Sequence, residues 1–265
     1  MTILPALPQP SRNWAMFLDI DGTLLDFAPT PDEVRAPPGL IHQLHRIRAT
    51  LDGALAIVSG RSITSIDEVF VQSRFAAAGQ HGVERRDAHG AASRSGVRLP
   101  ALEAARERLD AMIADHTGLV LEDKGQSIAL HYRLAPTLAA VAGAAMYSAW
   151  ATAGREYIVV AGSCVLELRP RDVNKGTAIV AFMRESPFAG RRPVFIGDDR
   201  TDEDGFRAVD AMGGHAIKVG IGATRAGWRI ASVSGVSEWL AHVADRLEHQ
   251  HSPMEKRHER TAAQG

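Results

Sequence analysis

The sequence predicts an α/β protein with a parallel sheet, interrupted by an inserted α+β segment. Two observations support this prediction. In the first and last thirds of the 265-residue chain, short apolar runs alternate with segments of helical periodicity, an order typical of parallel sheets. Between these thirds lie two pairs of neighbouring strand-like runs, which are typical of β-hairpins.

The first part of the expected sheet begins at Trp14–Leu18, an apolar run that ends abruptly at charged residues. Such a run fits a strand that is buried on both faces of a sheet. A helix is expected over Leu40–Leu51, a strand over Gly53–Val58, a helix over Ile63–Val71 and a strand over Phe75–Gly79. This order predicts neighbouring parallel strands.

The middle of the chain has a different pattern. Residues 85–99 are polar and rich in turn-forming residues, and helices are expected over Leu102–His116 and Ala135–Ala153. Each expected hairpin joins two runs around a glycine. The pairs are Leu119–Asp123 with Ser127–Arg133, and Tyr157–Ala161 with Cys164–Arg169.

The alternation of helix and strand returns after Asn174. Its elements are helices over Gly176–Met183, Thr201–Val209 and Val236–Leu247, and strands over Pro193–Ile196 and Ala216–Val219. The chain is therefore expected to divide into a disordered tail (1–12), a first core part (13–95), a cap domain (96–170), a second core part (171–248) and a disordered tail (249–265). An insertion of this size can hold a small core of its own.

The bulk composition is that of a globular protein, with 45% hydrophobic and 23% charged residues. Thirty basic residues face thirty-one acidic ones, a balance that predicts no nucleic-acid partner. No run approaches the roughly 20 apolar residues of a membrane helix, and residues 1–13 do not have the pattern of a signal peptide. We expect a cytoplasmic monomer without a membrane partner.

Ligand sites in open α/β sheets lie at the carboxyl ends of the strands, and four polar clusters are expected there. The first is the run from Asp19 to Thr23. The Asp19 carboxylate can attack phosphorus as a nucleophile, and Asp21 can protonate the leaving oxygen and later deprotonate water. Gly22 allows the sharp turn that brings both carboxylates to one pocket. Alternatively, these residues only end the strand.

The second and third clusters offer groups that can hold a phosphoryl group. Ser59-Gly60-Arg61 presents a hydroxyl and backbone N–H groups near a helix N-terminus, where anions bind. Alternatively, Ser59 or Ser62 is the N-cap of the next helix. Lys175 can keep Asp19 ionised and neutralise charge on the phosphoryl group. Alternatively, it is a solvated surface lysine.

The fourth cluster, Gly197–Glu203, collects carboxylates after a buried strand. Because like charges repel at close range, this cluster indicates a bound cation, and Mg²⁺ prefers oxygen ligands. Asp19, the backbone carbonyl of Asp21 and Asp198 are the expected ligands. Alternatively, the acidic residues after Asp198 cap the next helix and complement its dipole.

These clusters, in this order and on alternating strands, resemble the haloacid dehalogenase superfamily. The resemblance implies an α/β fold with a doubly wound parallel-sheet core and an inserted α+β cap domain. It also implies Asp19 as nucleophile, Asp21 as acid/base and Asp198 on Mg²⁺. Ser59 and Lys175 are implied as catalytic residues that contact the phosphate.

Further motifs between Trp14 and Leu247 resemble the trehalose-6-phosphate phosphatases of that superfamily. They are Asp-Ile-Asp-Gly-Thr-Leu (19–24), Ser-Gly-Arg (59–61), Gly-x-His-Gly-x-Glu (79–84), Glu-Asp-Lys-Gly (122–125), His-Tyr-Arg (131–133), Glu-x-Arg-Pro (167–170), Lys-Gly (175–176) and Gly-Asp-Asp-x-Thr-Asp-Glu (197–203). The resemblance implies a Mg²⁺-dependent phosphatase that hydrolyses trehalose 6-phosphate in trehalose biosynthesis, through an aspartyl-phosphate. It also implies a functional link to a trehalose-6-phosphate synthase.

The same resemblance assigns substrate-binding residues on both sides of the expected site. Besides Asp19 and Asp21, these are Ile20, Gly60, Arg61 and His81 on the core and Glu122, Lys124 and Glu167 on the cap. Without the resemblance, the charged cap residues are expected to form a solvated face. Two rival hypotheses remain: a phosphatase of the same fold acting on sucrose phosphate or mannosyl phosphoglycerate, and a non-catalytic regulatory domain that binds sugar phosphates.

Overall fold

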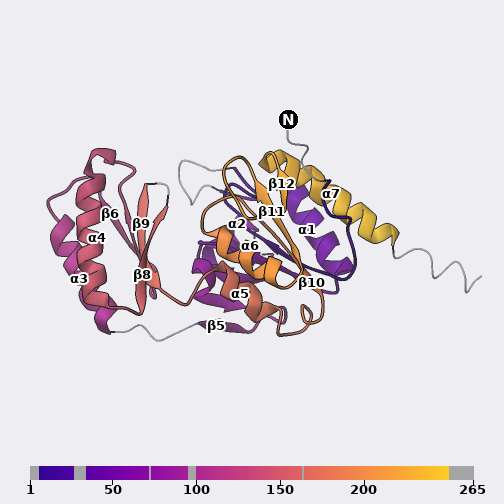
Figure 1. The fold of residues 1–265 in the computed structure, drawn as a ribbon, viewed down its shortest axis with the longest axis horizontal. Helices are drawn as coiled ribbons and strands as arrows, with labels where there is room; N and C mark the ends of the chain where they lie inside the picture. Colours follow the sequence, from indigo (N-terminus) through magenta and orange to yellow (C-terminus); the bar gives the residue numbers. More distant parts are fainter. Residues whose placement is uncertain (1–5, 27–33, 72, 95–99, 163, 251–265) are drawn as a thin grey trace, which may run out of the picture.

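The structure, a computed structural model, describes residues 6–26, 34–71, 73–94, 100–162 and 164–250. These residues form one sheet of eight strands and one of four. Figure 1 shows the smaller sheet with its helices on the left and the larger sheet, between helices, on the right. The expected α/β core with an inserted α+β cap is confirmed.

The core sheet has the strand order β12-β11-β10-β1-β2-β3-β4-β5. Its six parallel strands are β1 (Trp14–Leu18), β2 (Leu55–Val58), β3 (Ala76–Gly79), β10 (Arg192–Gly197), β11 (His215–Val219) and β12 (Trp228–Ile230). The chain starts in the middle at β1, adds β2 and β3 on one side, and after the cap adds β10, β11 and β12 on the other. The sheet is therefore doubly wound.

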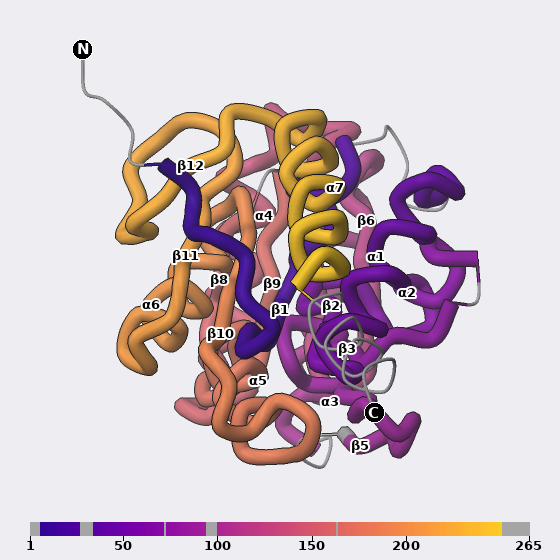
Figure 2. Tube along the Cα trace, turned by 90° about the vertical axis from the view of Figure 1, so that its right-hand side faces the viewer, coloured from indigo at the N-terminus to yellow at the C-terminus, as the bar shows by residue number. Residues whose placement is uncertain are grey.

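Helices cover both faces of this sheet because β1 is apolar on both. Trp14 stacks on Trp239 of α7 at 6.1 Å between ring centroids, whereas Phe17, whose side chain points to the opposite face, lies 5.9 Å from Phe182 of α5. Figures 1 and 2 show α1 beside α7, and α5 beside α6 on the other face. The core helices are α1 (Pro38–Thr50), α2 (Ile63–Val69), α5 (Lys175–Phe182), α6 (Asp202–Ala211) and α7 (Val233–His249).

Two short antiparallel strands, β4 (Glu84–Arg86) and β5 (Ala92–Arg94), extend the sheet beyond β3. The sequence predicted only a polar, turn-rich segment here. The buried Arg86 donates to both carboxylate oxygens of Asp67, at 2.8 and 2.6 Å. These edge strands are polar and lack the local apolar alternation that predicts a strand. The contact that fixes Arg86 involves Asp67, a residue elsewhere in the chain, so it leaves no local pattern in the sequence.

The cap sheet has the order β6-β7-β9-β8 and is antiparallel throughout. Its strands are β6 (Val120–Asp123), β7 (Ile128–His131), β8 (Tyr157–Gly162) and β9 (Val165–Pro170). Both expected hairpins are present. Two helices, α3 (Pro100–Ile113) and α4 (Ala139–Ala153, after a short 3₁₀ turn at Pro136–Leu138), cover the face that points away from the core (Figure 1). Their apolar side chains form a cluster separate from that of the core.

The expected division at residues 95/96 and 170/171 stays a prediction. Residues 1–5 and 251–265 of the expected tails lie outside the described residues. Within residues 6–12, Leu7 packs against the core cluster, and Gln250 Nε2 donates to the Pro10 carbonyl at 3.0 Å. Within the described ranges, no helix is both long enough and apolar enough to cross a membrane.

Candidate active site

Asp19 directly follows β1, at the edge of the sheet where the carboxyl ends of the parallel strands meet. Its side chain is buried, and Lys175 Nζ donates to Asp19 Oδ1 at 2.8 Å. Thr23 Oγ1 donates to Asp19 Oδ2 at 3.4 Å. Lys175 opens α5 and is only 2% exposed. It is therefore not the solvated surface lysine that the sequence left open.

The same ammonium group contacts a second carboxylate. Lys175 Nζ lies 2.6 Å from Oδ1 of Asp202, the fully buried first residue of α6. Oδ2 of Asp202 accepts the backbone N–H groups of Asp198 and Asp199, each at 2.9 Å. Asp202 thus ties Lys175 to the loop that carries Asp198. The sequence suggested for Asp202 only that it complements the dipole of the next helix. Gly197 is the feature that accompanies its burial, because a Cβ at residue 197 would lie 2.3 Å from Asp202 Cγ.

Carboxylate oxygens of Asp19, Asp198 and Asp202 lie within 4.8 Å of one another. Burial, opposed by Lys175, raises the pKa of Asp19 to about 7. Burial and the neighbouring carboxylates of Asp202 and Asp199 raise the pKa of Asp198 to about 6. Burial is the largest cause of both shifts and the neighbouring carboxylates add to it, so a divalent cation beside the two groups would favour their ionised forms. Asp202 accepts short hydrogen bonds at both oxygens, of 2.6 and 2.9 Å, whereas Asp19 Oδ2 and Asp198 Oδ1 have only the long contacts of Thr23 Oγ1 at 3.4 and 3.5 Å. Asp19 and Asp198 are therefore the side chains whose oxygens fit Mg²⁺.

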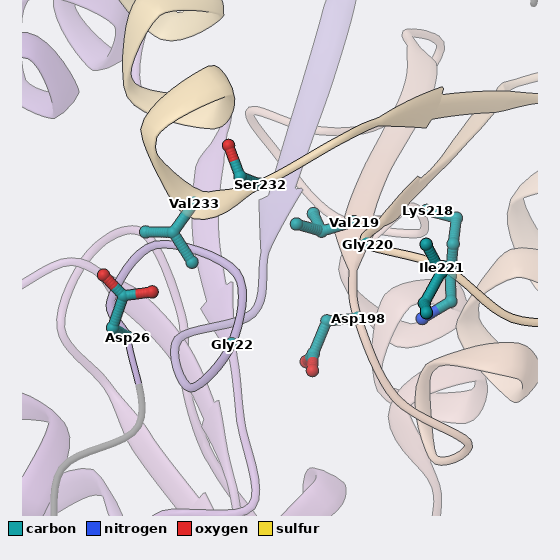
Figure 3. Close-up of a pocket in the computed structure, with 9 residues that line it drawn as sticks. All are labelled: Gly22, Asp26, Asp198, Lys218, Val219, Gly220, Ile221, Ser232 and Val233. Atoms are coloured by element: carbon teal, nitrogen blue, oxygen red, sulfur yellow. The ribbon is translucent and has the colours of Figure 1, made fainter.

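Asp198 is close to the turn after β1 because residue 22 is a glycine. Gly22 has φ +77°, and a Cβ there would lie 2.2 Å from Asp198 Oδ2. A pocket of about 310 Å³ opens beside Asp198 and extends to the start of α7. Figure 3 shows Asp198 between the Gly22 turn and the loop after β11, with Asp26, Lys218 and Ser232 around it. This space can hold the waters that Mg²⁺ usually keeps.

The Asp21 side chain forms a two-point ion pair with Arg61. Arg61 Nε donates to Oδ2 at 2.8 Å, and Nη2 donates to Oδ1 at 2.6 Å. Such a contact fixes the plane of the carboxylate as well as its position. Arg61 Nη1 lies 3.4 Å from Ser65 Oγ. Arg61 was expected only as a substrate contact, so its pairing with Asp21 was missed.

Ser59 ends up beside the turn that carries the two aspartates. The parallel pairing of β1 with β2 ends at Leu18 and Ile57, so Ser59, which follows β2, lies at the same edge of the sheet as Asp19. The Ser59 hydroxyl oxygen accepts the Arg61 N–H at 3.2 Å. The N-cap of α2 is Ser62, which accepts the backbone N–H of its third helical residue at 3.1 Å. The capping alternative is therefore confirmed for Ser62 and wrong for Ser59.

His81 lies at a contact between the core and the cap. It lies directly after β3 in a short 3₁₀ turn (Gln80–Gly82) with φ 59°, and its Nε2 is 3.3 Å from Glu167 Oε2 of β9. Gly60 leaves room for the imidazole, since a Cβ there would lie 2.9 Å from the ring. Burial lowers the pKa of His81, although the Glu167 carboxylate opposes this shift.

Glu122, Lys124 and Glu167 lie together on the cap. Strand register places Glu122 opposite Ala129 and Ala129 opposite Glu167, so both carboxylates belong to one row across the sheet. Lys124 Nζ is 3.7 Å from Glu167 Oε1 and 3.9 Å from Glu122 Oε2. Burial alone would raise the pKa of Glu167, but His81, Lys124 and a nearby arginine hold it well below its ordinary range. At Glu167 this surface is buried, unlike the solvated face that the residues alone had suggested.

Comparison with solved structures shows that this architecture, a doubly wound core with a separate cap, is the fold of haloacid dehalogenase-like hydrolases. A phosphatase of that superfamily from Bacteroides thetaiotaomicron has the same fold, with a TM-score of 0.60 at 17% identity, over 90% of this chain and 98% of the other. A solved structure of a trehalose-6-phosphate phosphatase related protein aligns with a TM-score of 0.75 and 26% identity, over 89% of this chain and 99% of the other.

The family follows from sequence similarity. The model of the family described as trehalose-phosphatase matches residues 17–232. The trehalose-6-phosphate phosphatase of Escherichia coli (strain K12) is 42% identical over 255 residues, which are 92% of each chain. This chain belongs to the trehalose-phosphatase family.

Proposed function

We propose that this chain hydrolyses trehalose 6-phosphate to trehalose and phosphate, as a step of trehalose biosynthesis. Membership of the trehalose-phosphatase family and the name of the Escherichia coli relative support this substrate. The geometry around Asp19 supports the reaction. We further propose that the chain acts as a cytoplasmic monomer and that a trehalose-6-phosphate synthase supplies its substrate.

In the first step of the proposed mechanism, an oxygen of the Asp19 carboxylate attacks phosphorus. A bond forms between that oxygen and phosphorus, and the bond between phosphorus and the sugar oxygen breaks. The sugar oxygen takes a proton from Asp21 as it leaves. In the second step, Asp21 removes a proton from water, the water oxygen bonds to phosphorus, and the phosphorus–Asp19 bond breaks. Phosphate leaves and both side chains return to their starting state.

Three groups would stabilise the phosphoryl group and the nucleophile. Lys175 keeps the Asp19 oxygen in place and carries a positive charge beside the phosphoryl oxygens. The Ser59 hydroxyl, at the same edge of the sheet as Asp19, can donate a hydrogen bond to a phosphoryl oxygen. Mg²⁺, held by Asp19, Asp198 and the Asp21 carbonyl, would neutralise negative charge between nucleophile and phosphate.

The cap residues would recognise the disaccharide. Glu122 and Glu167 can accept hydrogen bonds from sugar hydroxyls, and Lys124, which lies between them, can donate. From the core side, Gly60, Arg61 and His81 are the proposed contacts: Gly60 lies beside the His81 ring, which reaches Glu167 of the cap, and Arg61 pairs with Asp21. His81 of the core contacts Glu167 of the cap. A bound sugar would therefore have to move these two side chains apart or form hydrogen bonds in place of their contact.

The observation that carries the proposal is the 2.8 Å contact of the buried Lys175 with Asp19, beside Asp198. The test is phosphate release from trehalose 6-phosphate with saturating Mg²⁺. Asp19→Asn should reduce kcat by about 10³-fold or more, because the variant has no nucleophile. The matched control is Asp115→Asn, an exposed aspartate just after α3 of the cap, which should remain active.

Near-normal phosphate release by folded Asp19→Asn would reject Asp19 as nucleophile. A substrate panel tests the sugar: trehalose 6-phosphate, sucrose phosphate, mannosyl phosphoglycerate and glucose 6-phosphate. The proposed substrate is wrong if trehalose 6-phosphate is hydrolysed no better than glucose 6-phosphate. Saturable binding without Mg²⁺-dependent turnover would instead support the non-catalytic regulatory domain.

A further inference from the structure

Arg169 is a buried arginine of the cap that has no part in the proposed mechanism. It lies two residues after Glu167 on β9, so both side chains point to the same face of the strand. The residues that alternate with them, Leu166 and Leu168, pack into the apolar cluster of the cap. Arg169 therefore points, like Glu167, to the side of the cap sheet that faces the core.

The guanidinium group of Arg169 lacks hydrogen bonds where they are expected. Its residue is only 4% exposed, and Nε and Nη1 are buried without a hydrogen-bond partner among the described residues. Burial lowers the pKa of Arg169, while Glu167, Asp204 and Asp199 oppose the shift, so these carboxylates are its electrostatic neighbours. Buried N–H donors without a hydrogen-bond partner are costly even beside carboxylates, and such groups in native proteins call for an explanation.

The nearby carboxylates are already occupied by other donors. Glu167 Oε1 accepts from Ser127 Oγ at 3.0 Å, and Glu167 Oε2 lies 3.3 Å from His81 Nε2. Asp199 Oδ1 accepts the N–H and the hydroxyl of Thr201, at 2.8 and 2.7 Å. Nε and Nη1 of Arg169, which together carry three N–H donors, thus lie on the core-facing side of the cap sheet, beside carboxylates that already accept other hydrogen bonds.

We propose that Arg169 is a further substrate-positioning residue, whose Nε and Nη1 donate to oxygen acceptors of the bound sugar phosphate. This inference rests on the proposed function. The acceptors belong to the phosphoryl group or to the sugar, which offer the same oxygen chemistry. In this arrangement the substrate supplies the partners that the protein alone does not give to Arg169.

The first test compares steady-state kinetics of Arg169→Gln and Arg169→Lys with the wild type on trehalose 6-phosphate. Hydrogen bonds to a charged group contribute about 1.5–3 kcal/mol, so KM should rise about 10-fold or more, with a much smaller change in kcat. Lys keeps the charge but lacks the planar pair of donors and should rescue only part of the loss. Arg155→Gln, an exposed cap arginine, is the control and should leave KM unchanged.

The second test separates substrate binding from a structural role by thermal unfolding. If the main role of Arg169 is substrate binding, Arg169→Gln should lower the melting temperature of the substrate-free protein only slightly, because Nε and Nη1 lose no hydrogen bond there and only charge interactions such as that with Glu167 are removed. In an Asp19→Asn background, which prevents turnover, the same substitution should reduce the temperature shift caused by trehalose 6-phosphate. A lower melting temperature together with an unchanged substrate-induced shift and an unchanged KM would overturn the proposal.

Two further measurements identify which substrate oxygen accepts from Arg169 and test the proposed function separately from the role of Arg169. If the effect of Arg169→Gln is equal on trehalose 6-phosphate and phenyl phosphate, the acceptor is the phosphoryl group; if it is confined to trehalose 6-phosphate, the acceptor is on the sugar. Both outcomes support Arg169 as a substrate contact. The wild-type chain tests the proposed function alone: should it prefer another ester, that ester replaces trehalose 6-phosphate in the Arg169 comparison.

Discussion

Arg61 holds Asp21 through two hydrogen bonds, with Nε 2.8 Å from Oδ2 and Nη2 2.6 Å from Oδ1. Asp21, the proposed acid/base, is therefore oriented by a side chain on the neighbouring strand end and not by its own turn alone. A lysine at position 61 would keep the charge but not the planar two-point contact.

We predict that Arg61→Lys lowers kcat on trehalose 6-phosphate by about 10–100-fold, because general acid–base catalysis contributes about 10²–10⁴-fold and depends on the position of the acid. Arg207→Lys, in an exposed pair with Asp204, is the control and should keep wild-type kcat. An unchanged kcat for Arg61→Lys would mean that the ion pair does not orient Asp21.

The affinity for Mg²⁺ should rise with pH between about 6 and 8. The pKa of Asp19 is raised to about 7 and that of Asp198 to about 6 in the metal-free protein. Below these values both carboxyl groups hold protons, which the metal must displace; above them the ionised ligands are ready to bind. Calorimetric titration with Mg²⁺ in buffers of different ionisation enthalpy counts the released protons.

Proton release on Mg²⁺ binding should decrease from pH 6 to pH 8, and chelation of the metal should abolish turnover at every pH. An affinity for Mg²⁺ that does not change over this range would contradict the assignment of Asp19 and Asp198 as ligands.

Asp202→Asn should destabilise the protein by about 3–5 kcal/mol, because it leaves the buried Lys175 ammonium with one carboxylate partner fewer. The amide nitrogen would also oppose either Lys175 or the backbone N–H groups of the Asp198 loop, all of which are donors. Urea unfolding measures the effect. Asp210→Asn, at an exposed position of the same helix, should change the unfolding free energy by less than about 0.5 kcal/mol. Similar stability for both variants would argue against Asp202 as the link between α5 and α6.

Glu122→Ala should raise KM for trehalose 6-phosphate while leaving the hydrolysis of phenyl phosphate unchanged. The reason is that Glu122 lies on the cap, in the row that also holds Glu167, and contacts no group of the Asp19 cluster in the described structure. Glu107→Ala, on the exposed face of α3, serves as the matched control. Equal losses on both substrates would show that Glu122 supports the structure of the cap instead.

The sequence by itself determined the strands and helices that have local apolar patterns, and it placed Asp19, Asp21, Ser59 and Asp198 at strand ends. It determined the fold class for the same reason: the run Trp14–Leu18 must be buried on both sides, which requires helices on both faces. Strands β4 and β5 were not predictable, because a short polar strand depends on partners such as Asp67 for Arg86.

Only the tertiary structure decided which of these residues meet. Lys175 reaches Asp19 across 156 residues of sequence, and Arg61 reaches Asp21 across 40, because the fold brings the ends of β1 and β2 to one edge of the sheet and places the first residue of α5 beside them. The buried state of Asp202 and the unpartnered donors of Arg169 likewise depend on what surrounds them in space. Burial and hydrogen-bond partners are properties of packing, which a local pattern of residues does not contain. The turn that begins at Asp19 could therefore be located from the sequence, whereas its partners required the fold.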